Sequence, residues 1–182
     1  VYYPMTSGGT DRFFNIRGVP LFKDDEVIGA VIIHEDITEY KQTVELLKDT
    51  AELNQKIFSE SPIGISIYDE TGQCVQTNDS VGKIIGATKE QILKQNYNEI
   101  ESWKKSGLLS TAKKTIADGI TRRKEIQVTS SFDKKMKADC YLVSFSKEGK
   151  PHLMSMITDI TARMRAEEAL CNEKEFTETA LN

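Results

Sequence analysis

The sequence has few of the residues on which catalytic and metal sites usually depend. It contains three cysteines, two histidines and one tryptophan among 182 residues. Cys74, Cys140 and Cys171 are widely spaced and odd in number, which is typical of reduced thiols in a cytoplasmic protein and does not match a zinc site. The glycine pair after Ser7 is not followed by a phosphate-binding lysine. We therefore expect this fragment to be no enzyme and to hold no metal.

Long apolar runs and an excess of basic charge are also missing. No run reaches the ~18 residues of a membrane span, and the first residues lack a signal-peptide pattern. The net charge is -4, so charge gives no attraction for nucleic acid or an anionic membrane. These absences predict a cytoplasmic location, no nucleic-acid partner and no direct membrane contact of this fragment.

One tripeptide occurs twice. Asp36-Ile37-Thr38 and Asp159-Ile160-Thr161 each follow an apolar strand-like segment and precede a charged helical one. Such self-similarity at a fixed offset usually indicates a duplicated module. Because residues 1–38 read as three strands with no helix to cover an apolar face, and Val1 lies within a strand pattern, we expect a fragment of a longer protein that holds the end of one module and all of the next.

Periodicity and turn residues predict the elements of both modules. Residues 39–58 form a helix, which Pro62 ends. The second module then has two strands, three or four short helices and three further strands. Thr88 and Gln91 form a capping box within it. The expected ranges are strands 63–68 and 73–77, helices 78–85 and 108–118, and strands 123–132, 137–146 and 151–159.

This order of elements, the Ser61–Gly72 segment, Asn78, Gly86 and Gly149–Thr161 resemble the PAS family of sensor domains. The resemblance implies an α+β fold with a five-stranded antiparallel sheet in the order 2-1-5-4-3 and helices on one face. It divides the chain into a truncated first PAS domain (1–38), a linker helix (39–58), a complete PAS domain (59–161) and the start of a second signalling helix (162–182). Fold alone does not fix function.

The resemblance also implies a pocket between the sheet and the helices. Its predicted lining is almost wholly apolar, so a filled core and a small-molecule pocket both remain open. Tyr97 and Trp103 lie in the segment expected to roof it. The pocket candidates are Ile65, Ile67, Ile84, Tyr97, Trp103, Leu109, Ile116, Ile126, Val128, Cys140, Leu142, Leu153, Ser155 and Ile157.

No cofactor is predicted for that pocket. Haem binding in the family needs a histidine on the long helix before the last three strands, and His34 and His152 lie elsewhere. Covalent flavin needs a reactive cysteine in an Asn-Cys-Arg-like motif, which the residues after Asn78 do not supply. Haem and covalent flavin are therefore not expected, and an unknown small molecule is the alternative to an empty core.

Two sets of residues are expected to carry a signal. Asp36, Thr38, Asp159 and Thr161 form the junctions between strand and helix, where Thr161 is expected to cap the outgoing helix and Asp159 to add negative charge near its start. The spacing of Tyr40, Val44, Leu47, Ala51 and Phe58 is that of a coiled-coil seam, with an ordinary amphipathic helix as the alternative. Met154 and Met156, with Tyr141 and Val143, are expected to form an apolar patch on the outer sheet face, on which the 39–58 helix of the same chain or of a partner packs.

Together these features predict a sensory module of a multidomain signalling protein, most readily a two-component histidine kinase, with an output domain in the same chain. It would act as a homodimer, joined through its helices and the outer sheet face. The alternatives are a ligand-free dimerisation or spacer module, and the PAS region of a cyclic-dinucleotide cyclase or a transcriptional regulator.

Overall fold

The computed structural model describes residues 2–7 and 10–167. It divides into two compact units, Val1–Gln55 and Lys56–Asn182, and the division falls within one helix. Each unit is described by itself. Among the described residues, no helix combines the length and the apolar character that crossing a membrane requires.

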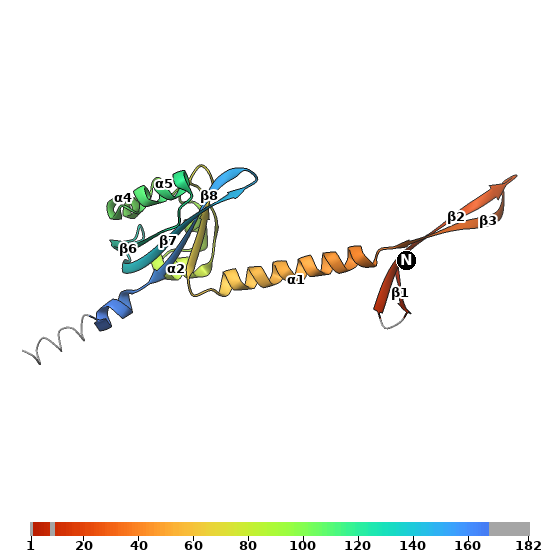
Figure 1. Ribbon diagram of the computed structural model, residues 1–182, viewed down its shortest axis with the longest axis horizontal. Helices are drawn as coiled ribbons and strands as arrows, with labels where there is room; N and C mark the ends of the chain where they lie inside the picture. Colours follow the sequence, from red (N-terminus) through yellow and green to blue (C-terminus); the bar gives the residue numbers. More distant parts are fainter. Residues whose placement is uncertain (1, 8–9, 168–182) are drawn as a thin grey trace, which may run out of the picture. The chain divides into compact units, whose positions relative to one another are not determined.

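The first unit is a three-stranded antiparallel sheet followed by a long helix (Figure 1). Strands β1 (Tyr2–Ser7), β2 (Thr10–Lys23) and β3 (Glu26–Asp36) lie in the order β1-β2-β3. Asp24 and Asp25 turn the β2–β3 hairpin with φ values of 50° and 64°, the left-handed conformation that a two-residue hairpin favours. Large apolar side chains on this hairpin are exposed, for example Val19 at 52% and Ile32 at 60%. The described side chains of β2 and β3 therefore form no covered core.

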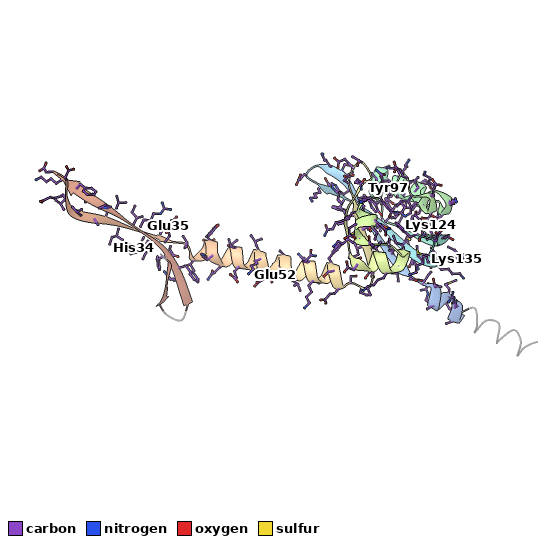
Figure 2. The ribbon with its side chains drawn as sticks, turned by 180° about the vertical axis from the view of Figure 1, so that it is seen from behind. His34, Glu35, Glu52, Tyr97, Lys124 and Lys135 are labelled. Carbon is purple, nitrogen blue, oxygen red and sulfur yellow. The ribbon has the colours of Figure 1, made fainter. Side chains whose placement is uncertain are left out.

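Helix α1 (Thr38–Glu60) runs for 23 residues and contains no buried residue. Figure 2 shows Glu52 projecting from it into solvent, as His34 and Glu35 do from β3. Isolated helices are marginally stable in water unless an apolar face is packed. Packing within the described part of the chain therefore leaves the apolar residues of α1 exposed.

The second unit is an α+β domain built on a five-stranded antiparallel sheet, as predicted. The sheet order is β5-β4-β8-β7-β6, which is 2-1-5-4-3 counted within the domain. Its strands are β4 (Gly64–Tyr68), β5 (Cys74–Thr77), β6 (Arg122–Thr129), β7 (Lys135–Lys147) and β8 (Lys150–Asp159). Strand β8 pairs with β4 on one side and with β7 on the other.

Four short helices cover one face of that sheet and enclose the core with it. They are α2 (Asp79–Ile85), α3 (Lys89–Leu93), α4 (Glu101–Ser106) and α5 (Leu108–Asp118). The predicted capping box opens α3, with Thr88 and Gln91 bonded reciprocally. Figure 2 shows Tyr97 within the densely packed side chains of this unit. The core includes Ile92, Leu108, Ala112, Ala138, Leu142 and Leu153, all at most 1% exposed.

Gly64 lies where β4, α2 and β8 approach most closely. A Cβ atom at this position would stand 2.7 Å from Cγ2 of Ile157 and 3.1 Å from Cα of Val81. Close approach of this kind accepts glycine and no larger residue without a shift of the neighbours.

We predict that Gly64→Ala lowers the free energy of unfolding of the second unit by about 1–3 kcal/mol, because the added methyl group overpacks this contact. Urea unfolding followed by the fluorescence of Trp103, the single tryptophan of the chain, measures it. Gly29→Ala, at a position with no atom within 4 Å, is the control and should leave that transition in place. Equal stability of wild type and Gly64→Ala would contradict the prediction.

Candidate functional site

A small cavity lies between the sheet and the helices of the second unit. Its volume is about 50 Å³, room for one or two water molecules. Side chains from β4, α2, α4, β6, β7 and β8 line it. It is thus the place at which the sheet and the helical layer meet around unfilled space.

The predicted pocket residues fall into three groups. Six line the cavity: Trp103, Ile126, Val128, Cys140, Ser155 and Ile157. Six others belong to the surrounding core and do not reach the cavity: Ile84, Tyr97, Leu109, Ile116, Leu142 and Leu153. The last two, Ile65 and Ile67, do neither.

The predicted face of β4 was wrong. Gly64, Ser66 and Tyr68 are buried and alternate with the half-buried Ile65 and Ile67, so the isoleucines point to the outer face of the sheet. Hydrophobicity alone favoured them as inward residues. The close contact at Gly64 and the burial of the Tyr68 ring decide the register instead, because side chains of a strand alternate between its two faces.

Hydroxyl groups make the cavity lining more polar than the sequence indicated. Ser66 Oγ lies 3.1 Å from Thr77 Oγ1, and Ser130 Oγ donates to the Ile85 carbonyl at 2.7 Å. Burial raises the pKa of Tyr68, so its phenol stays protonated. Among the described residues, no buried side-chain nitrogen or oxygen atom lacks a hydrogen-bond partner. A ligand that bonded to the Ser66 or Ser130 hydroxyl would therefore have to exchange an existing hydrogen bond.

Three aromatic rings pack against one another beside the cavity, and two of them, Tyr68 of β4 and Trp103 of α4, line it. Tyr97 and Trp103 stack with centroids 5.8 Å apart, and each meets Tyr68 edge-on at 5.5 Å. Edge-to-face and offset arrangements are the favourable geometries for aromatic pairs. Tyr68 was missed as a member of this cluster because β4 was assigned the opposite face.

The two described cysteines are unreactive core residues. Burial raises the pKa of Cys140 to about 12 and that of Cys74 to about 11. Both thiols are therefore protonated at neutral pH and pack as small apolar groups. Cys171 lies outside the described residues.

The two Asp-Ile-Thr junctions have the same geometry. Thr161 Oγ1 accepts a hydrogen bond from the Lys137 N–H at 3.0 Å, as Thr38 Oγ1 does from the Phe13 N–H at 2.9 Å. The Thr161 N–H donates to Asp159 Oδ1 at 2.9 Å, and the Thr38 N–H donates to Asp36 Oδ1 at 3.0 Å. Each corner thus joins the last strand, the strand before it and the first residue of a helix.

The threonine has a different partner from the one predicted. The first intrahelical bond runs from the Met164 N–H to the Ile160 carbonyl, so Ile160 occupies the N-cap position and Thr161 is the first helical residue. The Thr161 hydroxyl therefore reaches back to β7 and does not cap the helix. Asp159 satisfies one of the otherwise unpaired amides at the start of the helix.

Both junction carboxylates are held in the ionised form. Hydrogen bonds from the Thr38 side chain and backbone lower the pKa of Asp36. For Asp159, burial opposes ionisation, but hydrogen bonds from Thr161 and the charges of Lys134 and Arg165 outweigh it, so the pKa is again lowered. A negative charge beside the amino end of a helix is also favourable for the helix.

The predicted helix seam is a stripe of exposed side chains. Tyr40, Val44, Leu47 and Ala51 are exposed, and Phe58 is half-buried. The described part of the second helix, residues 161–167, is too short to show whether the pattern repeats, and residues 168–182 lie outside the description.

The outer face of the sheet carries two apolar rows across three strands. Ile65, Met156 and Tyr141 are opposite one another in β4, β8 and β7, and Ile67, Met154 and Val143 form the next row. Arg123 lies over the Tyr141 ring at 5.6 Å from its centroid. Lys124 of β6 and Lys135 of β7, labelled in Figure 2, belong to the hairpin that ends the sheet.

The comparisons with known proteins agree with this architecture. The family model for the PAS domain matches residues 2–39 and 62–162. The chain belongs to the PAS domain family, and the match includes both the three-stranded first unit and the complete second one. A comparison with curated proteins found no significant match.

Several solved PAS domains share the fold at low sequence identity. The PAS domain of an HTR-like protein from Haloarcula marismortui has a TM-score of 0.54 at 18% identity, covering 66% of this chain and 99% of that one. A domain of a sensory box sensor histidine kinase/response regulator from Geobacter sulfurreducens has a TM-score of 0.52 at 18% identity, covering 62% and 96%. A PAS domain from Colwellia psychrerythraea has a TM-score of 0.55 at 17% identity, covering 62% and 98%.

We predict that Thr161→Val lowers the stability of the second unit by about 1 kcal/mol, because the half-buried Lys137 N–H loses its acceptor. Thr161→Ser keeps the hydroxyl and should retain most of that stability. Urea unfolding with Trp103 fluorescence measures both. Thr38→Val, the same change in the first unit, is the control and should not move this transition. An equal loss in the Val and Ser variants would contradict a role for the hydroxyl.

Stability should also depend on the ionisation of Asp159. Its pKa is below the ordinary 3.8 in the folded protein, so the unfolded chain binds the proton more readily. The contribution of ionised Asp159 to the free energy of unfolding is complete at pH values above the ordinary pKa of 3.8. It is lost as the pH falls through the lower pKa of the folded protein. The Asp159→Asn variant keeps an acceptor oxygen at this position, but its side chain does not titrate. Between about pH 5 and about pH 3, the unfolding free energy of the variant should therefore fall less than that of wild type, and parallel pH profiles would contradict this.

Proposed function

We propose that the chain is a sensory and regulatory region of a multidomain signalling protein, in which the second unit relays a change in its core to the helix that follows it. Residues 1–38 are the last strands of a first PAS domain, 39–58 a linker helix, 59–161 a complete PAS domain and 162–182 the start of the next helix. The likeness of two matched domains to PAS domains of signalling proteins supports this reading.

One observation carries the proposal. Strand β8 lines the cavity with Ser155 and Ile157, and two residues further on Asp159 orients the amide of Thr161. A change in the packing around the cavity therefore reaches the helix start through a single short stretch of strand. Such a change would bias the helix between two arrangements, as in other switching proteins.

The cavity is small for a bound ligand. Pockets for drug-sized molecules are usually several hundred Å³, whereas this cavity measures about 50 Å³ and its buried polar groups are paired. A bound small molecule would thus require the aromatic rings beside the cavity to move. The same observation favours the second candidate, a ligand-free dimerisation and spacer module. Haem and covalent flavin remain unexpected on the grounds of sequence.

We further propose that the chain forms a homodimer through α1 and the outer sheet face. The exposed stripe on α1 and the two apolar rows across β4, β8 and β7 support this, because unpaired apolar surfaces of this kind usually mark interfaces. A cytoplasmic histidine kinase domain in the same chain is the proposed output. A cyclic-dinucleotide cyclase or a transcriptional regulator is the alternative.

Native mass spectrometry of gently purified protein tests these proposals together. We expect a dimer that carries an additional small-molecule mass. Cys140→Phe, which fills the cavity, should remove that mass and keep the dimer. Leu47→Asp, on the exposed face of α1, should weaken the dimer and keep the mass.

A dimer without added mass would favour the spacer module over the sensor. A monomer without added mass would contradict both candidates.

A further inference from the structure

The last turn of α1 has no capping group in its own sequence. The final four carbonyls of a helix lack partners within it. This turn contains no basic residue, and Ser61-Pro62 follows in place of the glycine that commonly ends a helix. The Ile57 carbonyl accepts from the Ser61 N–H at 3.1 Å. The Phe58 carbonyl accepts instead from the side chain of Asn78, at 2.9 Å.

The Asn78 amide uses its full hydrogen-bonding capacity. Nδ2 donates to the carbonyls of Phe58 and Ile63, both at 2.9 Å. Oδ1 accepts from the N–H of Ile65 at 2.9 Å and from that of Val81 at 3.4 Å. The residue is 2% exposed, and an amide offers two donor hydrogens and one oxygen with two lone pairs. Since Asn78 is also the N-cap of α2, one side chain closes the end of α1 and opens α2.

A second contact joins the same two places. Ser80 Oγ, one residue into α2, donates to the Ser61 carbonyl at 2.5 Å. Helix α2 in turn forms a wall of the cavity with Val81 and Ile85. If the end of α1 moved alone, a buried Nδ2–H would be left without an acceptor, and a buried unpaired donor is strongly unfavourable. The end of α1 and the start of α2 therefore move together or lose this contact.

We propose that Asn78 is a positioning residue that couples the last turn of α1 to the α2 wall of the cavity. The domain then has an input from the helix that precedes it, in addition to any input through the cavity. The signalling meaning of this input rests on the proposed function, whereas the coupling itself is a property of the domain.

Hydrogen exchange of the whole chain, read by mass spectrometry, tests the coupling. Lys56 is exposed on α1, so Lys56→Gly weakens the helix there, and Lys56→Ala is the matched control. Relative to the alanine variant, glycine should lower the protection of amides 57–61 about fivefold. Through Asn78 the amides of α2 should lose protection as well, by up to the same factor. Helix α3, which Thr88 caps independently, should not change.

The same comparison is then made with Asn78→Asp. This variant keeps an oxygen for Ile65 and Val81 and loses the Nδ2 donor, which bonds to the Phe58 carbonyl at the end of α1 and to the Ile63 carbonyl. The glycine effect should now stay within amides 57–61 and leave α2 unchanged. If Asn78 had only a structural role, Asn78→Asp would lower the protection of α2 with either residue at position 56. Lys56→Gly would then still lower the protection of α2 relative to Lys56→Ala.

The proposal would be overturned if Lys56→Gly still lowered the protection of α2 in the Asn78→Asp variant. It would also be overturned if Lys56→Gly left α2 unchanged when Asn78 is present. If Asn78→Asp does not fold, Asn78→Ser takes its place, because serine still caps α2 and is too short to reach Phe58. Failure to find a ligand by native mass spectrometry would weaken the sensor function and leave this exchange result intact.

Discussion

The pairing of β8 on both of its edges is the constraint on which the second unit depends. Strand β8 lies between β4 and β7, so a shift by one residue would turn its whole inner face outward and break both ladders. Its inner residues line the cavity, and its last residue orients the outgoing helix. Sliding of the strand is therefore excluded, and only a change of twist or bend can pass along it. Any relay through this strand must be small in amplitude at the corner and become larger along the helix.

The Asp-Ile-Thr corner occurs in both units, so its geometry can be compared between the open sheet of the first unit and the packed core of the second. The two N–H···O hydrogen bonds at Thr38 and their counterparts at Thr161 differ in donor–acceptor distance by about 0.1 Å. The apolar residues on the sheet of the first unit are nevertheless exposed. The geometry of the corner thus does not require a covered core behind it, but it does require the neighbouring strand that supplies the N–H group.

Local signals in the sequence predict the helices and strands well. They do not predict the contacts between residues that are far apart in the chain. The capping box at Thr88 and Gln91 depends on residues three apart, and the sequence alone predicts it. The face of β4 was misread because Gly64 and Tyr68 are placed by partners on α2 and α4. The hydroxyl of Thr161 was given to its own helix because its true partner, Lys137, lies on another strand. Asn78 was recognised, but its partner Phe58 is twenty residues away.

The construction of the cavity indicates which wall can move. On the sheet side, backbone ladders hold every strand, and the Ser66 hydroxyl is hydrogen-bonded to that of Thr77. On the helical side, α4 has only six residues, has no side-chain cap at its start and ends at Gly107 in the left-handed conformation. Short helices with few backbone bonds belong to the less stable parts of a domain. Expansion of the cavity would thus begin with Trp103 and α4, and the sheet would respond through the aromatic contact with Tyr68. The register of β4, which the sequence failed to predict, is therefore what places the Tyr68 ring against Trp103 of α4.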